Sequence, residues 1–173
     1  MKHEVEKLIK AARTLVPDTV LAPLPLDECL GVPAWRDFEH QVWAIGEQIR
    51  QLFLKAPRLR ADRALQEQIV DIACDRRAHR GRQSFVMLLG YRSCVEHAGR
   101  LVGQLDDEFV HGHVVDAIYK MRAQGYSDQV QPLLDDKGAW IRNVANRYLN
   151  WEEASNKPMQ TGGHSPAADR QSR

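Results

Sequence analysis

The stretch that decides the fold is LLDDKGAWIRNVANRYLNW, residues 133–151. Two acidic residues and a short polar loop precede a run in which apolar residues recur every three or four positions. Those apolar residues are Ile141, Val144, Ala145, Tyr148 and Leu149. Because this spacing places them on one face of a helix, the stretch predicts a loop followed by an amphipathic helix.

The same pattern occurs earlier in the chain. Residues 141–149 align with residues 110–118 at an offset of 31, and residues 110–118 align less closely with 81–89 at an offset of 29. The phrase LDD also occurs twice, at 105–107 and at 134–136. Self-similarity at intervals of 20 to 50 residues is typical of repeat proteins.

Helical periodicity extends through most of the chain, and no segment maintains the alternation of period two that a strand requires. The sequence therefore predicts an all-α protein. Four prolines between positions 17 and 36 predict an irregular connector, because proline lacks an N–H and disfavours helix in the residue before it. The expected helices of the repeated part alternate between first helices at 63–75, 92–105 and 127–134 and second helices at 81–90, 109–121 and 139–151.

The pattern L-L-x-D, a loop, then V-R-x-x-A-x-x-A-L resembles HEAT repeats, with a period shorter than the usual 40 to 47 residues. The resemblance implies a short right-handed α-solenoid of about three helix pairs with capping helices before them. The expected organisation is an N-terminal helix at 1–16, a Pro-rich connector at 17–36, a repeat domain at 37–151 and a disordered tail at 152–173. An irregular helical bundle is the alternative.

The tail is polar and contains NKPMQ, which resembles the ends of proteins encoded by bacterial integron cassettes. Composition is that of an ordinary soluble protein, with 43% hydrophobic and 27% charged residues and a net charge of +1. The longest strongly apolar run is FVMLLG, too short to span a membrane, and the start lacks a secretory signal. We therefore expect a cytoplasmic protein without a membrane partner.

Charge is distributed unevenly along the chain. Residues 55–82 carry eight Lys/Arg against four Asp/Glu, and residues 96–136 carry three against eight. The turn DRRAHRGR at 75–82 is the most basic segment, and a phosphate or nucleic-acid contact there is one interpretation. The other is that its cations stabilise a helix C-terminus. The candidate anion contacts are Arg76, Arg77, Arg80 and Arg82.

No constellation of catalytic residues is recognisable, and we expect no enzyme activity and no cofactor. His111 and His113 are two positions apart on a predicted helix, which turns their side chains about 200° away from each other and disfavours a shared metal. Cys29, Cys74 and Cys94 have no CxxC spacing, so buried, unreactive thiols are expected. Asp135 or Asp136 with Arg142 is expected to hold the loop together, as the corresponding residues do in HEAT-like repeats.

The resemblance also implies a function. In solenoids of this type the second helices line the concave face, so their exposed positions are the candidate contacts to a protein partner. They are His113, Asp116, Lys120, Asn143, Asn146 and Arg147. A protein-binding module follows, with an inhibitor or immunity-type protein as its narrower form. The alternative is a nucleic-acid-binding protein related to DNA glycosylases of this fold.

Overall fold

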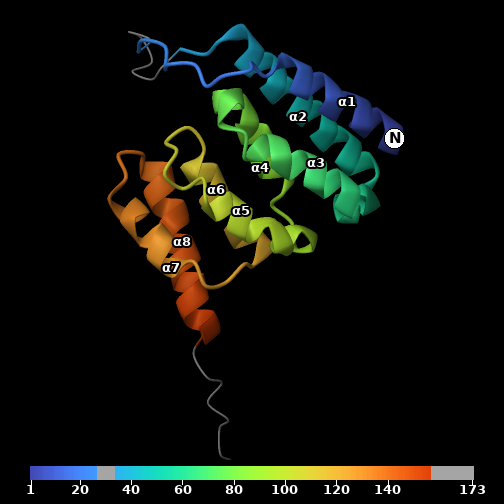
Figure 1. Ribbon diagram of the computed structural model, residues 1–173. Coiled ribbons are helices and arrows are strands. Elements are labelled where there is room, and N and C mark those ends of the chain that lie inside the picture. Colours follow the sequence, from blue (N-terminus) through green and yellow to red (C-terminus); the bar gives the residue numbers. More distant parts are fainter. Residues whose placement is uncertain (27–33, 157–173) are drawn as a thin grey trace, which may run out of the picture.

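The computed structural model of the chain describes residues 1–26 and 34–156 (Figure 1). Within these ranges the regular elements are helices, with no β-strand among them, which confirms the all-α prediction. Residues 27–33 of the predicted connector, which include Cys29, and residues 157–173 of the predicted tail lie outside the described residues.

Successive helices of the chain pack as pairs that follow one another along the molecule (Figure 1). The α-helices are α1 (Lys2–Leu15), α2 (Asp37–Lys55), α3 (Arg63–Ala73), α4 (Gln83–Leu88), α5 (Ala98–Val102), α6 (His111–Met121), α7 (Ser127–Val130) and α8 (Ala139–Asn156). The 3-10 helices are η1 (Pro57–Ala61), η2 (Arg76–Arg82), η3 (Arg92–His97) and η4 (Gln131–Asp135).

The even-numbered α-helices form a continuous row of contacts. Helix α2 packs on α4, α4 on α6 and α6 on α8, and we call these four helices the second row. Each also packs on the odd-numbered helix of its own pair, and α1 further contacts α3 while α3 contacts α5. One apolar core runs through the whole arrangement, from Val5 on α1 to Tyr148 on α8.

Helix α3 shows how the sequence forms these elements. The Asp62 carboxylate accepts a hydrogen bond from the backbone N–H of Leu65 at 3.2 Å and so caps the helix start. The apolar stripe of α3 is then buried, with Leu65, Ile69 and Ile72 each at most 3% exposed. Burial of such side chains stabilises the fold by about 1.5–3 kcal/mol each.

Two of the expected first helices are shorter and less regular than predicted. The segment predicted at 92–105 consists of η3 followed by α5, and the segment predicted at 127–134 consists of α7 followed by η4. Pro132 lies in η4, where its missing N–H prevents the α-helical hydrogen bond to the preceding turn. Apolar periodicity marks which face is buried, but it does not distinguish α from 3-10 geometry.

The second helix predicted at 81–90 is also shorter, because η2 precedes α4. Within η2, His79 adopts a φ of 46° and a ψ of −131°, a conformation that non-glycine residues rarely adopt. Its buried ring accepts a hydrogen bond at Nε2 from the backbone N–H of Leu21 at 3.2 Å. The turn thus holds the connector against the second row.

Helix α8 continues to Asn156, beyond the end predicted at residue 151. The reason is Glu152, which is 3% exposed and acts as an acceptor inside the last helix pair. Its carboxylate accepts hydrogen bonds from Gly125 N–H at 2.5 Å, from Tyr148 Oη at 2.8 Å and from the hydroxyl of Ser127. Sequence periodicity cannot reveal that Glu152 is buried, because carboxylate side chains usually lie at the surface.

Two side-chain contacts of matching register, each between a basic residue type and an aspartate, connect the loops that precede the second-row helices. The Arg82 guanidinium, which is fully buried, donates to the Asp107 carboxylate and to Ala73 O at 3.0 Å. His111 Nε2 lies 2.9 Å from Asp136 Oδ2. Both contacts join residues 25 positions apart. His111 occupies the position that aligns with Arg82 in the repeated sequence, so the alignment already indicated that these two residues are equivalent.

Arg142 was expected to pair with Asp135 or Asp136. Its guanidinium instead donates to two backbone oxygens, Asp136 O at 2.6 Å and Lys137 O at 3.0 Å. The Asp136 carboxylate accepts from Gly138 N–H at 2.7 Å in addition to its contact with His111. Arg142 therefore still holds the loop together, but through the main chain.

Candidate functional site

Four of the six candidate contact residues lie together on the surface between α6 and α8. Asp116 Oδ2 accepts from Lys120 Nζ at 2.5 Å, and Asp116 Oδ1 accepts from Arg147 Nη2 at 2.8 Å. Asn143 lines a pocket of about 480 Å³ together with Asp116, Arg147, Val144 and Trp140. Asp116 is thus the centre of a polar cluster that joins two second-row helices.

His113 lies at the edge of the same surface. Its ring packs against that of Trp140 with centroids 5.1 Å apart, and Trp140 is 50% exposed. Burial lowers the pKa of His113, so the ring is neutral at pH 7. Asn146 is exposed and accepts a hydrogen bond from Asn150 Nδ2 at 3.3 Å, and it does not line the pocket.

Large exposed apolar side chains occur on several helices of the second row. They are Trp43 and Leu54 on α2, Met87 on α4 and Trp140 on α8, all between 37% and 53% exposed. Helix α4 packs on α3, α2 and α6, so its exposed Met87 lies on the side of the helix that faces away from these three neighbours. We call the solvent-facing side of α2, α4, α6 and α8 the open face.

The four arginines of the basic turn do not form one surface. Arg82 is buried and paired with Asp107. Arg76 pairs with Asp106 at 2.5 Å, and Arg77 pairs with Asp75 at 2.8 Å. Arg80 stacks its guanidinium over the ring of Trp35, 4.9 Å from the ring centroid. Arg76, Arg77 and Arg82 are therefore each balanced by an acid within the protein.

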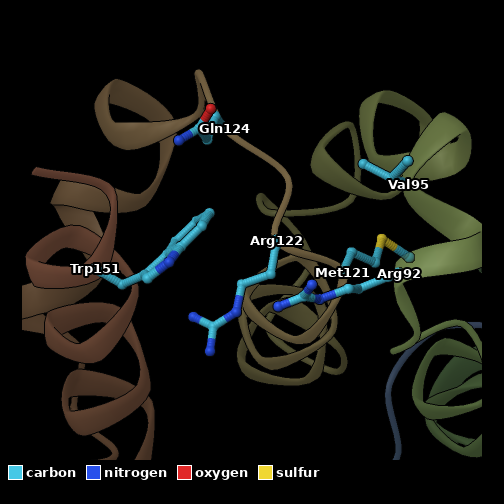
Figure 2. Close-up of a pocket in the computed structure, with 6 residues that line it drawn as sticks. All are labelled: Arg92, Val95, Met121, Arg122, Gln124 and Trp151. Carbon is cyan, nitrogen blue, oxygen red and sulfur yellow. The ribbon is translucent and has the colours of Figure 1, made fainter. Parts of the chain in front are cut away.

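A second pocket, which the sequence did not indicate, lies at the C-terminal ends of α6 and α8. It has a volume of about 540 Å³ and is lined by Arg92, Val95, Met121, Arg122, Gln124 and Trp151. Figure 2 shows the side chains of Arg92 and Arg122 entering this space from different elements, with Trp151 along one wall. The basic residues are 30 positions apart in sequence, and nothing in either local motif links them.

The backbone of Arg122 is unusual. This residue ends α6 with a φ of 61° and a ψ of 39°, the left-handed conformation in which glycine or asparagine is preferred. Its guanidinium carbon lies 4.5 Å from the ring centroid of Tyr119 and 5.0 Å from that of Trp151. One guanidinium nitrogen, Nη1, is buried without a hydrogen-bond partner.

The remaining chemistry is sparse. Among the described residues, no group of three or more His, Cys, Asp and Glu side chains is arranged to hold a metal ion. Cys94 is buried and Cys74 is partly buried, and burial raises the pKa of both thiols. Neither thiol is thereby activated as a nucleophile.

None of the helices in the described ranges combines the length and the hydropathy that crossing a membrane would require. Comparison of the chain with protein-family models, with curated proteins and with solved structures found no match.

Proposed function

We propose that this chain is a non-enzymatic protein-binding module, built as a short right-handed solenoid of about three HEAT-like helix pairs with α1 and α2 as N-terminal caps. The sequential packing of the second row supports this arrangement. So do the two loop contacts that join residues 25 positions apart. In a repeat array each helix pair contacts chiefly its neighbours, and equivalent contacts recur between successive pairs.

The observation that carries the binding proposal is the composition of the open face. Large apolar side chains are exposed on its helices, and one of them, Trp140, lines a pocket with Asp116 and Arg147 of the ion-pair cluster. Protein interfaces are enriched in Trp, Met and Arg, and a few such residues contribute most of the binding energy. The partner is therefore another protein, and Trp140 with its neighbouring pocket is the proposed anchor.

The basic turn lends no support to a nucleic-acid partner. Phosphate binding requires cations that are available to the backbone of the nucleic acid. Arg76, Arg77 and Arg82 are each paired with a carboxylate of the chain itself. A cytoplasmic inhibitor that covers a toxin or an enzyme is the narrower form of the proposal, and such a partner loses activity when the chain is added.

Site-specific crosslinking tests the proposal. A photoreactive amino acid at Trp140 is expected to capture a partner in the source cell, whereas the same group at the exposed Gln129 of α7 is not. The captured protein is then purified and its affinity measured. Trp140→Ala is expected to weaken binding by about 2 kcal/mol, as for a central interface residue.

The matched control is Val20→Ala, which shortens a side chain that is 61% exposed in the connector. It should bind the purified partner with unchanged affinity. Equal affinities for the parent, Trp140→Ala and Arg147→Ala proteins would contradict an interface on the open face.

A further inference from the structure

The pocket between the ends of α6 and α8 has an excess of positive charge. Arg92 and Arg122 both line it, and neither forms an ion pair with an acid among the described residues. Residues 96–136 contain eight Asp and Glu, yet none of them lines this pocket. Two guanidinium groups around one open space create a positive potential that favours the binding of an anion.

Three of the six residues that line the pocket are apolar, and they stand beside the two arginines. Met121 and Val95 face it from one side and Trp151 from the other (Figure 2). The amide of Gln124 adds one further hydrogen-bonding group. A ligand that fits such walls carries an apolar body beside its charge. A carboxylate attached to an apolar body supplies both the charge and the apolar surface, whereas inorganic phosphate supplies the charge alone.

Arg122 is held in place for such a role. Its left-handed backbone costs free energy that glycine would avoid, and the ring faces of Tyr119 and Trp151 restrict its guanidinium. Arg122 Nη1 is buried without a hydrogen-bond partner, so Nε and Nη2 are the donors that remain for a ligand. Planar guanidinium groups bind carboxylates through paired N–H donors, which gives both strength and orientation.

We propose that the pocket lined by Arg92, Arg122 and Trp151 binds a carboxylate group attached to an apolar or aromatic body. The inference does not depend on the proposed interface around Trp140. Two sources supply this chemistry: a free aromatic acid, or an acidic side chain next to an apolar residue of a partner protein.

The test titrates the full chain with three soluble probes. Nuclear magnetic resonance of the backbone and indole N–H groups detects the binding of each probe. Phenylacetate is expected to shift the signals of Trp151, Arg122 and Gln124 in a saturable way. Phenylacetamide, its neutral analogue, is expected to leave them unchanged. A terminally blocked peptide with one Phe-Glu pair separates the sources: tighter binding of the peptide indicates a partner protein, and tighter binding of phenylacetate indicates a small acid.

Two substitutions assign the effect to the arginines. Arg122→Gly removes the guanidinium at a position where glycine adopts the backbone conformation without strain, and Arg92→Gln alters an exposed side chain. Each is expected to lower the affinity for phenylacetate about tenfold, as the loss of a charge-assisted hydrogen bond does. Arg58→Gln, at an exposed arginine of η1, is the control and is expected to change nothing.

Equal binding of phenylacetate and phenylacetamide would overturn the proposal, because the pocket would then recognise only the ring. Tighter binding of inorganic phosphate than of phenylacetate would overturn the choice of a carboxylate. Retained affinity in both Arg122→Gly and Arg92→Gln, or an equal loss in Arg58→Gln, would show that the pocket is not the site.

Discussion

The two ends of helix α6 differ in how the protein balances positive charge. At its N-terminal end, Arg82 and His111 each contact a carboxylate from the next loop, Asp107 and Asp136. At its C-terminal end, Arg122 stacks on aromatic rings and has no carboxylate partner within the described chain. Positive charges are present at both ends, so charge alone does not distinguish them.

The comparison separates two uses of a cation. A buried ion pair leaves little capacity for a ligand, because its donors are already occupied and its desolvation is compensated within the fold. A cation beside an open pocket without an acid retains donors for an external anion. We therefore assign the N-terminal end of α6 to stability and the C-terminal end to binding.

The largest expected effect comes from breaking the pair at the N-terminal end. Arg82→Met leaves the Asp107 carboxylate without its buried counter-charge, and removal of one member of a buried pair typically costs about 3–5 kcal/mol. Urea unfolding at pH 7 measures the change. Arg77→Met is the matched control, because Arg77 pairs with Asp75 at the exposed surface and its loss should leave stability nearly unchanged. Equal effects of the two substitutions would contradict the distinction between them.

Glu152→Gln is expected to have an intermediate effect of about 1–3 kcal/mol, because a buried acceptor is replaced by a partly mismatched amide. Burial by itself would raise the pKa of Glu152, but hydrogen bonds from Ser127, Tyr148 and Gly125 hold it below the ordinary value of 4.5. The contribution of the carboxylate is therefore full above about pH 4.5 and is lost as the pH falls through the lowered pKa.

The parent and the Glu152→Gln protein should thus differ most at pH 7 and converge as the pH falls toward 3. Urea unfolding midpoints at pH 7, 5, 4 and 3 measure this convergence. A difference that is constant over the whole range would show that the carboxylate charge is not what anchors α8.

The smallest expected effect on stability is that of Arg122→Gly. Relief of the left-handed backbone conformation contributes about 1 kcal/mol, and loss of the stacking on Tyr119 and Trp151 costs a similar amount. Thermal unfolding should therefore place the variant within about 0.5 kcal/mol of the parent, a difference typical of positions outside the core. A large loss of stability would show that Arg122 is needed for the fold and would count against its assignment to ligand binding.

The helices that sequence reasoning predicted best are those with an uninterrupted apolar stripe. Helix α6 was expected at 109–121 and is found at His111–Met121, and α3 was expected at 63–75 and is found at Arg63–Ala73. The predictions were poorest where tertiary contacts decide the backbone. Glu152 extends α8 through its contacts with Gly125, Ser127 and Tyr148. The 3-10 segment η4 has a local cause instead, the missing N–H of Pro132.

The candidate contact residues show the same limit. Because Asp116, Lys120 and Arg147 are polar positions opposite an apolar stripe, their exposure on the second row could be predicted from periodicity. The ion pair between Asp116 and Arg147 could not be predicted, since Arg147 belongs to another helix pair. The alignment of His111 with Arg82 was visible in the sequence, but the acids that each contacts lie in the following pair.

By itself the sequence determined that the chain is helical, where its main stripes lie and that a loop and helix pattern recurs, because these properties depend on contacts close along the chain. Only the tertiary structure decided which arginines are neutralised. Arg82, Arg92 and Arg122 are alike in a sequence, and the acid or open space that each meets is contributed by residues distant along the chain. Side-chain charge is a local property, whereas its balance depends on how the helix pairs pack.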